Sequence, residues 1–227
     1  MQARDRLIVA ADLSSRDEIV RLAEELEGVA GAVKIGLQAF VANGPALVRE
    51  VAAAHRVFLD LKLHDIPNTV EHAVREAESL DIAMLTVHAS GGEAMLRAAR
   101  SDKTLILAVT ILTSLSDDDL QRAGFAAPAR ESAVRLAKLA QQSGIGGVVA
   151  SPLEIASIRE ACGSSMTIVT PGIRPRGSAG DDQRRTMTAA EAVRAGADFI
   201  VVGRPVTGAK NRREAALQLV DEMERAG

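Results

Sequence analysis

The chain contains no tryptophan, no tyrosine and only four phenylalanines among its 227 residues. Proteins that bind single-stranded nucleic acid stack bases on aromatic side chains, so the composition disfavours that class of function. The net charge is −3, and such a chain lacks the broad basic surface that nucleic acid requires. We therefore expect no nucleic-acid partner.

Cysteine and long apolar runs are also scarce. Cys162 is the single cysteine, which excludes an intramolecular disulfide and a cysteine-rich metal site. No apolar run reaches membrane-spanning length. Residues 1–6 lead directly into an apolar segment, without the long hydrophobic stretch of a signal peptide. These absences predict a cytoplasmic protein with no membrane partner.

Several familiar motifs are missing as well. No glycine-rich dinucleotide fingerprint follows the first apolar run, and no G-x-S-x-G nucleophile elbow occurs. The four histidines, at positions 55, 64, 72 and 88, do not have the i, i+4 spacing of a helical metal site. The sequence thus predicts neither a dinucleotide cofactor nor a bound metal.

What the sequence does contain is a regular alternation of apolar runs and amphipathic segments. With 47% hydrophobic residues, the chain can bury a sizeable core. Eight continuous apolar runs are typical of parallel strands covered on both faces. Their alternation with helical segments indicates a (β/α)8 TIM barrel formed as a single domain over residues 1–227, with a doubly wound open sheet as the rival. The predicted strands are 7–11, 31–35, 57–61, 82–87, 105–111, 147–150, 167–170 and 199–202, and the clearest helices are 17–26, 129–142 and 211–225.

Two connections are longer than the rest. Residues 113–128 include Ser116 followed by three aspartates, a pattern typical of a helix N-cap with an acidic first turn. Residues 172–186 are rich in glycine and arginine, and long connections of this kind in compact barrels often form lids over active sites. We predict a phosphate-gripping lid around residues 172–186.

The third predicted strand ends in an unusual pair of charges. Alternate side chains of a strand share a face, so Phe58, Asp60 and Lys62 point one way. Val57, Leu59, Leu61 and Leu63 then form the opposite face, which helices would cover. A buried charge costs several kcal/mol unless it is paired, so a core built for stability alone would not place Asp60 and Lys62 inside. The alternative is a strand end that frays into solvent with ordinary surface charges.

Other polar residues occur at the ends of the predicted strands, where active sites of such barrels lie. Asp12 ends the first strand, His88 the fourth, and Thr113 follows the fifth. Lys34 lies between Val33 and Ile35 and should point away from both. An alternating set formed by Lys34, Asp60, Lys62 and nearby Asp65 favours catalysis over a structural ion network.

A second group of residues suggests a phosphate site. Gly203 and Arg204 end the eighth strand, where a glycine admits an oxyanion to the backbone and an arginine adds a charged partner. The loops after strands seven and eight often bind phosphate in these barrels. Gln183 could close over the same phosphate from the lid. The alternatives are a plain strand-ending turn at Gly203 and a solvated loop residue at Gln183.

Several of these segments together resemble the orotidine 5′-phosphate decarboxylase family in its shorter bacterial form, over essentially the whole chain. They are Asp60-Leu61-Lys62-Leu63-His64-Asp65-Ile66-Pro67-Asn68-Thr69, Thr170-Pro171-Gly172-Ile173-Arg174-Pro175, Asp181-Asp182-Gln183-Arg184-Arg185 and Val202-Gly203-Arg204-Pro205. The resemblance implies a carboxy-lyase of pyrimidine biosynthesis that converts orotidine 5′-monophosphate to UMP and carbon dioxide without metal or organic cofactor.

The resemblance also implies a role for each matching position. Lys62 would be the general acid that protonates C6, and Asp60 would lie beside the substrate carboxylate, with Lys34 and Asp65 completing the array. The family forms homodimers, in which Asp65 and Thr69 would reach the neighbouring site. Ribose contacts match Asp12, Lys34 and Thr69, a pyrimidine contact matches Thr113, and the lid and phosphate site match Arg174, Gln183, Gly203 and Arg204. The full expected substrate-binding set is Asp12, Lys34, Asp60, Leu61, Lys62, Leu63, His64, Asp65, Ile66, Pro67, Asn68, Thr69, Thr113, Arg174, Gln183, Gly203 and Arg204.

Two other functions remain open at this point. Related metal-dependent sugar-phosphate enzymes share the Asp-x-Lys-x-x-Asp pattern, but they typically bind magnesium through a glutamate on strand two. This chain has Lys34 in that place, and an ammonium group cannot ligate a cation. A non-catalytic sensor of nucleotide phosphates could use the same barrel, turn and lid, although phosphate binding alone needs no charge array.

Overall fold

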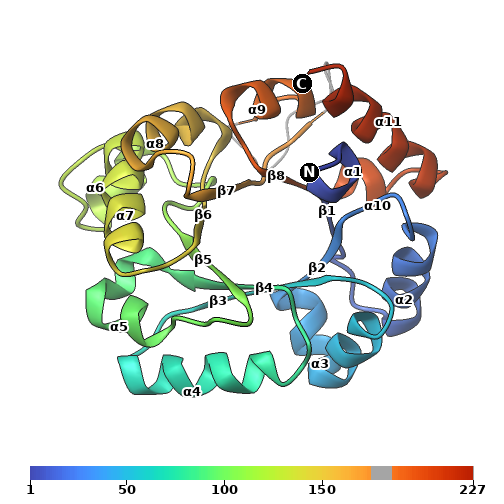
Figure 1. Cartoon of the computed structure of the whole chain (residues 1–227), viewed down its shortest axis with the longest axis horizontal. Coiled ribbons are helices and arrows are strands. Elements are labelled where there is room, and N and C mark those ends of the chain that lie inside the picture. Colours follow the sequence, from blue (N-terminus) through green and yellow to red (C-terminus); the bar gives the residue numbers. More distant parts are fainter. Residues whose placement is uncertain (175–185, 227) are drawn as a thin grey trace.

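The structure, a computed structural model, describes residues 1–174 and 186–226, in which eight parallel strands close into a barrel in chain order (Figure 1). Each strand pairs with the next, and β8 returns to pair with β1. This closure confirms the (β/α)8 barrel and excludes the open doubly wound sheet. The strands are β1 (Leu7–Ala10), β2 (Ala32–Gly36), β3 (Val57–Leu63), β4 (Met84–His88), β5 (Leu105–Val109), β6 (Gly147–Val149), β7 (Thr167–Thr170) and β8 (Phe199–Val202).

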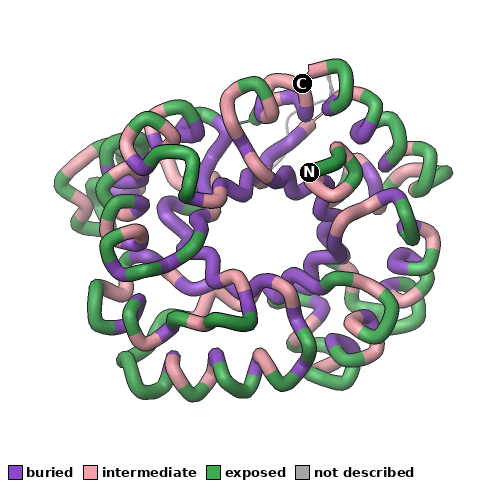
Figure 2. Tube along the Cα trace, in the orientation of Figure 1, coloured by how far each residue is buried: buried purple, intermediate pink, exposed green. Residues whose placement is uncertain are grey.

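Helices surround the barrel on its outside, and their inward sides are buried while their outward sides are exposed (Figure 2). Within the described ranges, none of them has the length and apolar character needed to span a bilayer. In chain order they are α1 (Ala3–Arg6), α2 (Arg16–Glu25), α3 (Leu37–Ala52), α4 (Pro67–Glu78), the 3-10 turn η1 (Ala89–Gly91), α5 (Gly92–Ala98), α6 (Asp117–Arg122), α7 (Ala129–Gln142), the 3-10 turn η2 (Pro152–Glu154), α8 (Ile155–Cys162), α9 (Ala189–Ala195), α10 (Arg204–Thr207) and α11 (Arg212–Glu224).

The predicted elements agree with the structure except at some of their ends. β7, β8 and α7 have the predicted bounds. Ser116 caps α6 as predicted, and its side chain and that of Asp119 form a reciprocal capping box. The prediction ended β3 too early, at residue 61, because the strand continues through an irregular stretch to Leu63, which pairs with Val87 of β4.

The apolar core forms two shells. The outer shell lies between strands and helices and includes Val57 and Leu59 of β3, whereas Phe58 belongs to an inner cluster inside the barrel. This distribution confirms the predicted faces of Val57, Phe58 and Leu59, and Leu61 and Leu63 also pack against the outer shell as predicted. Burying each large side chain contributes roughly 1.5–3 kcal/mol, so both shells hold the strands firmly in place. The inner cluster comprises Ile8, Ala10, Ala32, Phe58, Met84, Leu107, Val169, Phe199 and Val201.

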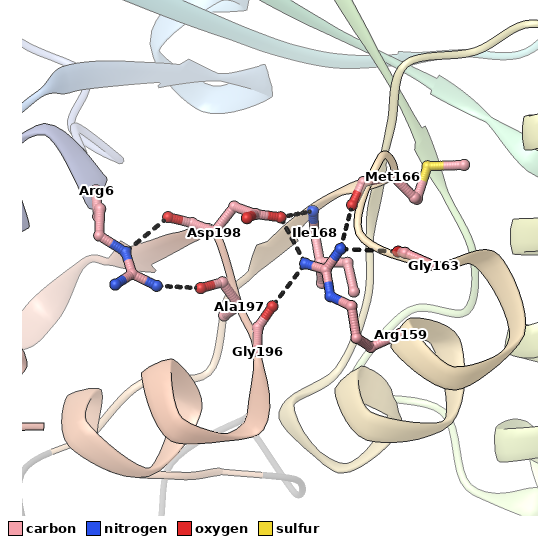
Figure 3. Close-up of polar contacts among 8 residues, drawn as sticks. All are labelled: Arg6, Arg159, Gly163, Met166, Ile168, Gly196, Ala197 and Asp198. Carbon is pink, nitrogen blue, oxygen red and sulfur yellow. Dashed lines mark hydrogen bonds and ion pairs between the residues drawn. The ribbon is translucent and has the colours of Figure 1, made fainter. Parts of the chain in front are cut away.

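A polar network joins the starts of β7 and β8 to the helices beside them (Figure 3). Arg159 of α8 donates from Nη1 to the carbonyls of Gly163 and Met166 at 3.0 and 2.7 Å. Its Nη2 lies 2.7 Å from both the Gly196 carbonyl and Oδ2 of Asp198. The same Asp198 oxygen accepts the backbone N–H of Ile168 at 2.8 Å, and Arg6 donates to the carbonyls of Ala197 and Asp198. The network fixes two neighbouring strands at the amino end of the barrel.

Candidate active site

A cavity of 580 Å³ opens at the carboxyl ends of the strands. Asp12, Thr113 and Gly203, which line it, directly follow β1, β5 and β8 or lie a few residues beyond them. Ala10, Phe58 and Val201 of the inner cluster also line it and give it an apolar base. The volume is that of a small-molecule site, in the place where barrels of this kind bind substrates.

Charged side chains from β2, from β3 and from the segment after β1 meet in this cavity. The Nζ atom of Lys34 lies 3.0 Å from Oδ1 of Asp12 and 3.4 Å from Oδ2 of Asp60. The Nζ atom of Lys62 lies 2.8 Å from Oδ1 of Asp60. Lys34 and Asp60 are each only 8% exposed. The charges therefore alternate in the order Asp12, Lys34, Asp60, Lys62, as the strand pattern predicted for Lys34 and Asp60.

The electrostatic environment keeps Asp60 ionised. Burial acts to raise the pKa of Asp60, but the ammonium groups of Lys34 and Lys62 oppose burial, and hydrogen bonds from Lys62 and Thr86 add to their effect. The balance lowers the pKa of Asp60 below its ordinary value of 3.8. At neutral pH the cavity thus contains a fixed carboxylate between two fixed ammonium groups.

The backbone at Lys62 is strained. Its φ of 51° lies in the left-handed region. Among the described residues other than glycine, only Lys62 and Asp81 have a positive φ. Such conformations cost about 1–3 kcal/mol and cluster at functional sites. Lys62 lies within the register shift between Leu59 and Leu63, so its ammonium reaches Asp60 from an irregular stretch and not from the regular alternation that the sequence suggested.

Two further residues support the array, and sequence reasoning did not identify them. Thr86 of β4 is fully buried, and its Oγ1 accepts the Lys62 backbone N–H at 2.8 Å and donates to Oδ1 of Asp60 at 2.9 Å. A Cβ on Gly36 would lie 2.8 Å from Nζ of Lys34 and 2.9 Å from Oδ1 of Asp12, so glycine leaves room for that ion pair. Thr86, a polar residue inside an apolar strand, carried the same signal that identified Lys34.

The predicted phosphate-site residues fall partly within the described structure. Arg174, Gly203 and Arg204 line the cavity together with Thr113. Arg174 donates from Nη1 to the carbonyl of Ile173 at 2.8 Å. At Gly203 a Cβ would make only ordinary contacts, so packing within the protein does not demand glycine there. Gln183 and most of the predicted lid lie outside the described residues.

The rest of the predicted set does not line this chain's own cavity. Leu61 and Leu63 pack against the outer core. The residues that follow are exposed around the start of α4, and Pro67 begins that helix in the first-turn position that proline favours. The residues placed outside the cavity are Leu61, Leu63, His64, Asp65, Ile66, Pro67, Asn68 and Thr69.

Two histidines lie beside the charged array. The ring centroids of His64 and His88 are 5.3 Å apart. Burial is the main cause that lowers the pKa of His88, the charges of His64 and Lys62 lower it further, and Asp60 opposes them. The neutral form of His88 is thus favoured in the folded protein.

The chemistry of the array differs from that of a metal site. Among residues 1–174 and 186–226, no group of three or more His, Cys, Asp or Glu side chains could hold a metal ion. The central group on β2 is the Lys34 ammonium, which has no lone pair for a cation. What the arrangement can supply is a proton and a fixed pattern of charge in a partly enclosed cavity.

Comparison with known proteins agrees with this geometry. The family model of orotidine 5′-phosphate decarboxylase / HUMPS matches residues 5–219. The orotidine 5′-phosphate decarboxylase of Trichlorobacter lovleyi is 47% identical over 232 residues, covering 98% of this chain and 96% of the relative. That of Heliobacterium modesticaldum is 46% identical over 236 residues, covering 98% and 97%. The crystal structure of the Lactobacillus acidophilus orotidine 5′-phosphate decarboxylase matches with a TM-score of 0.85 and 35% identity, covering 96% of this chain and 98% of that one. The chain therefore belongs to the orotidine 5′-phosphate decarboxylase / HUMPS family.

Proposed function

We propose that the chain decarboxylates orotidine 5′-monophosphate to UMP and carbon dioxide in pyrimidine biosynthesis, with Lys62 as the general acid. The observation that carries the proposal is the contact between Lys62 and Asp60 at 2.8 Å in the mouth of the barrel, with Lys34 on the other side of Asp60. The relatives that cover nearly the whole chain bear the name of this activity.

The chemistry of the reaction matches such an array. When the bond between C6 and the carboxylate breaks, the electron pair stays on C6 in the plane of the ring, where no π system delocalises it. A fixed ammonium stabilises that charge and then donates a proton to form the new C–H bond. Lys62 therefore ends the step as a neutral amine and regains its proton from solvent. Because the array is already in place, little reorganisation accompanies the reaction.

Phosphate binding occupies another part of the same cavity in this proposal. Arg174, Gly203 and Arg204 line the cavity and would hold the phosphate, and Asp12, Lys34 and Thr113 would contact the ribose and the pyrimidine. Residues 172–186, including Gln183, would form a lid within a single barrel domain spanning residues 1–227. Binding energy from the remote phosphate can be used in the transition state if it drives lid closure.

A homodimer with shared sites is part of the same proposal. Asp65 and Thr69 are exposed on this chain, and so is the apolar side chain of the intervening Ile66, at 66%. A second protomer that covers this segment would bury Ile66 and receive Asp65 and Thr69 at its own cavity. We also expect a cytoplasmic location, which suits the free buried thiol of Cys162.

The direct test is to mix the purified protein with orotidine 5′-monophosphate and follow the loss of its ultraviolet absorbance in excess EDTA. We expect UMP to form at the same rate with and without EDTA. Loss of the activity on chelation would favour the metal-dependent sugar-phosphate enzymes instead. Tight binding of UMP without turnover of the substrate would favour a nucleotide-phosphate sensor.

A further inference from the structure

We infer that Thr86 is a positioning residue of the reaction, whose hydroxyl holds the Asp60 carboxylate and the Lys62 backbone in the arrangement that presents the Lys62 ammonium. This inference rests on the proposed function, because it concerns how the general acid is held. Thr86 does not line the cavity, so it acts through its two neighbours and not on the substrate.

The hydrogen bonds around Thr86 form a closed ring. Oγ1 donates to Oδ1 of Asp60 at 2.9 Å and accepts the backbone N–H of Lys62 at 2.8 Å. The same Asp60 oxygen accepts a proton from Nζ of Lys62 at 2.8 Å. A hydroxyl has one proton and two lone pairs, so the bond to Asp60 directs a lone pair toward Lys62. Each bond in the ring therefore orients the others.

Strand register explains why this ring depends on position 86. Leu59 pairs with Leu85, and Leu63 pairs with Val87, so three residues of β3 face Thr86 alone. The surplus residues form an irregular bulge, and such bulges often redirect a side chain next to an active site. The Thr86 hydroxyl supplies the acceptor for Lys62 at the point where the regular ladder is interrupted.

The left-handed conformation of Lys62 makes that acceptor important. A non-glycine residue with a φ of 51° keeps this strained geometry only if surrounding contacts enforce it. Two contacts constrain Lys62 in this way, the backbone hydrogen bond to Thr86 and the ammonium bond to Asp60. Without the hydroxyl, the backbone of Lys62 loses one constraint and the carboxylate of Asp60 loses its donor from β4.

The test compares Thr86→Val, which keeps the shape but removes the hydroxyl, with Thr86→Ser, which keeps the hydroxyl. Thr104→Val is the matched control, because Thr104 is a buried threonine at the start of β5 whose hydroxyl bonds the Ile82 carbonyl at 3.3 Å. We expect Thr86→Val to lower kcat roughly 100-fold, the loss typical of a displaced catalytic group. Its KM and its affinity for UMP should stay unchanged. Thr86→Ser should restore most of kcat, and Thr104→Val should keep it.

Several results would overturn the inference. They are a wild-type kcat in Thr86→Val, an equal loss of kcat in Thr86→Ser, or an equal loss in Thr104→Val. If Thr86→Val does not fold, Thr86→Cys replaces the hydroxyl with a weakly hydrogen-bonding thiol, to be compared with Thr86→Ser, which has a similar shape; a wild-type kcat in Thr86→Cys would overturn the inference too. The wild-type protein distinguishes failure of the proposed function from failure of this inference. If the wild type does not turn over orotidine 5′-monophosphate, the proposed function is contradicted. If the wild type is active and Thr86→Val has the same kcat, only the role of Thr86 is contradicted.

Discussion

At the scale of single residues, the site depends on one buried carboxylate placed between two ammonium groups. Asp60 bonds Lys62 and Thr86 through one oxygen and contacts Lys34 through the other. Removing one partner from such a buried set leaves the others uncompensated, so the cost exceeds that of a surface pair. The charges are thus interdependent, and two of them, on Lys62 and Asp60, also act on the neighbouring His88.

The effect of burial beside the array can be measured at His88. A histidine of the unfolded chain titrates near its ordinary pKa of 6.5, whereas burial above all lowers the pKa of His88 in the folded protein. Below pH 6.5 the unfolded state therefore binds more protons, and stability falls as the pH falls. We expect His88→Gln to lose less stability than the wild type on acidification from about pH 7 to about pH 5, measured as urea midpoints. His72→Gln, on the exposed face of α4, should follow the wild type, and equal slopes for all three proteins would contradict the account.

At the scale of elements, much of the arrangement followed from local patterns. Apolar runs and amphipathic periods predicted the strands and helices, and a lysine inside an apolar strand predicted that Lys34 points into the barrel. The bulge of β3, the φ of Lys62 and the ring through Thr86 were not predictable, because they depend on where β4 lies beside β3. The roles of Asp65, Thr69 and Gln183 remain predictions.

The network around Arg159 is another feature that only the fold reveals, because it joins α8 to the loops before β7 and β8. Hydrogen bonds to a charged group are worth about 1.5–3 kcal/mol, so we expect Arg159→Ala to lower the free energy of unfolding by about 2 kcal/mol. The kcat should not change, because the network lies at the end of the barrel opposite the cavity. Arg135→Ala, which removes an exposed pair with Glu131 on α7, should cost at most about 0.5 kcal/mol. If the two variants lost similar amounts of stability, or if Arg159→Ala lowered kcat, the Arg159 network would not have the purely stabilising role assigned to it here.

At the scale of the whole molecule, the barrel separates stability from chemistry. The inner cluster and the Arg159 network hold the strands, while the strained Lys62 and the other members of the charged array lie at the carboxyl ends. In the proposed dimer, the exposed residues 64–69 after β3 would contact the partner. A site completed by two protomers would make activity depend on association.

Sharing of sites predicts complementation between inactive variants. Lys62→Ala and Asp65→Ala protomers should each have very low activity, because each lacks one charge of every site. After subunit exchange, a heterodimer would contain one site with both Lys62 and Asp65, so the mixture should recover partial activity. Exchange followed by fluorescent labels provides the control. Proven exchange without recovery would mean that each chain forms its site alone.

In the proposed reaction, the ammonium of Lys62, held against Asp60, performs the chemical step. The most direct measurement is UMP formation by Lys62→Ala, made alongside a binding titration with UMP and with the exposed Lys103→Ala as control. We predict that Lys62→Ala binds UMP but forms none from orotidine 5′-monophosphate, while Lys103→Ala matches the wild type. A Lys62→Ala protein that forms UMP at the wild-type rate would contradict the account.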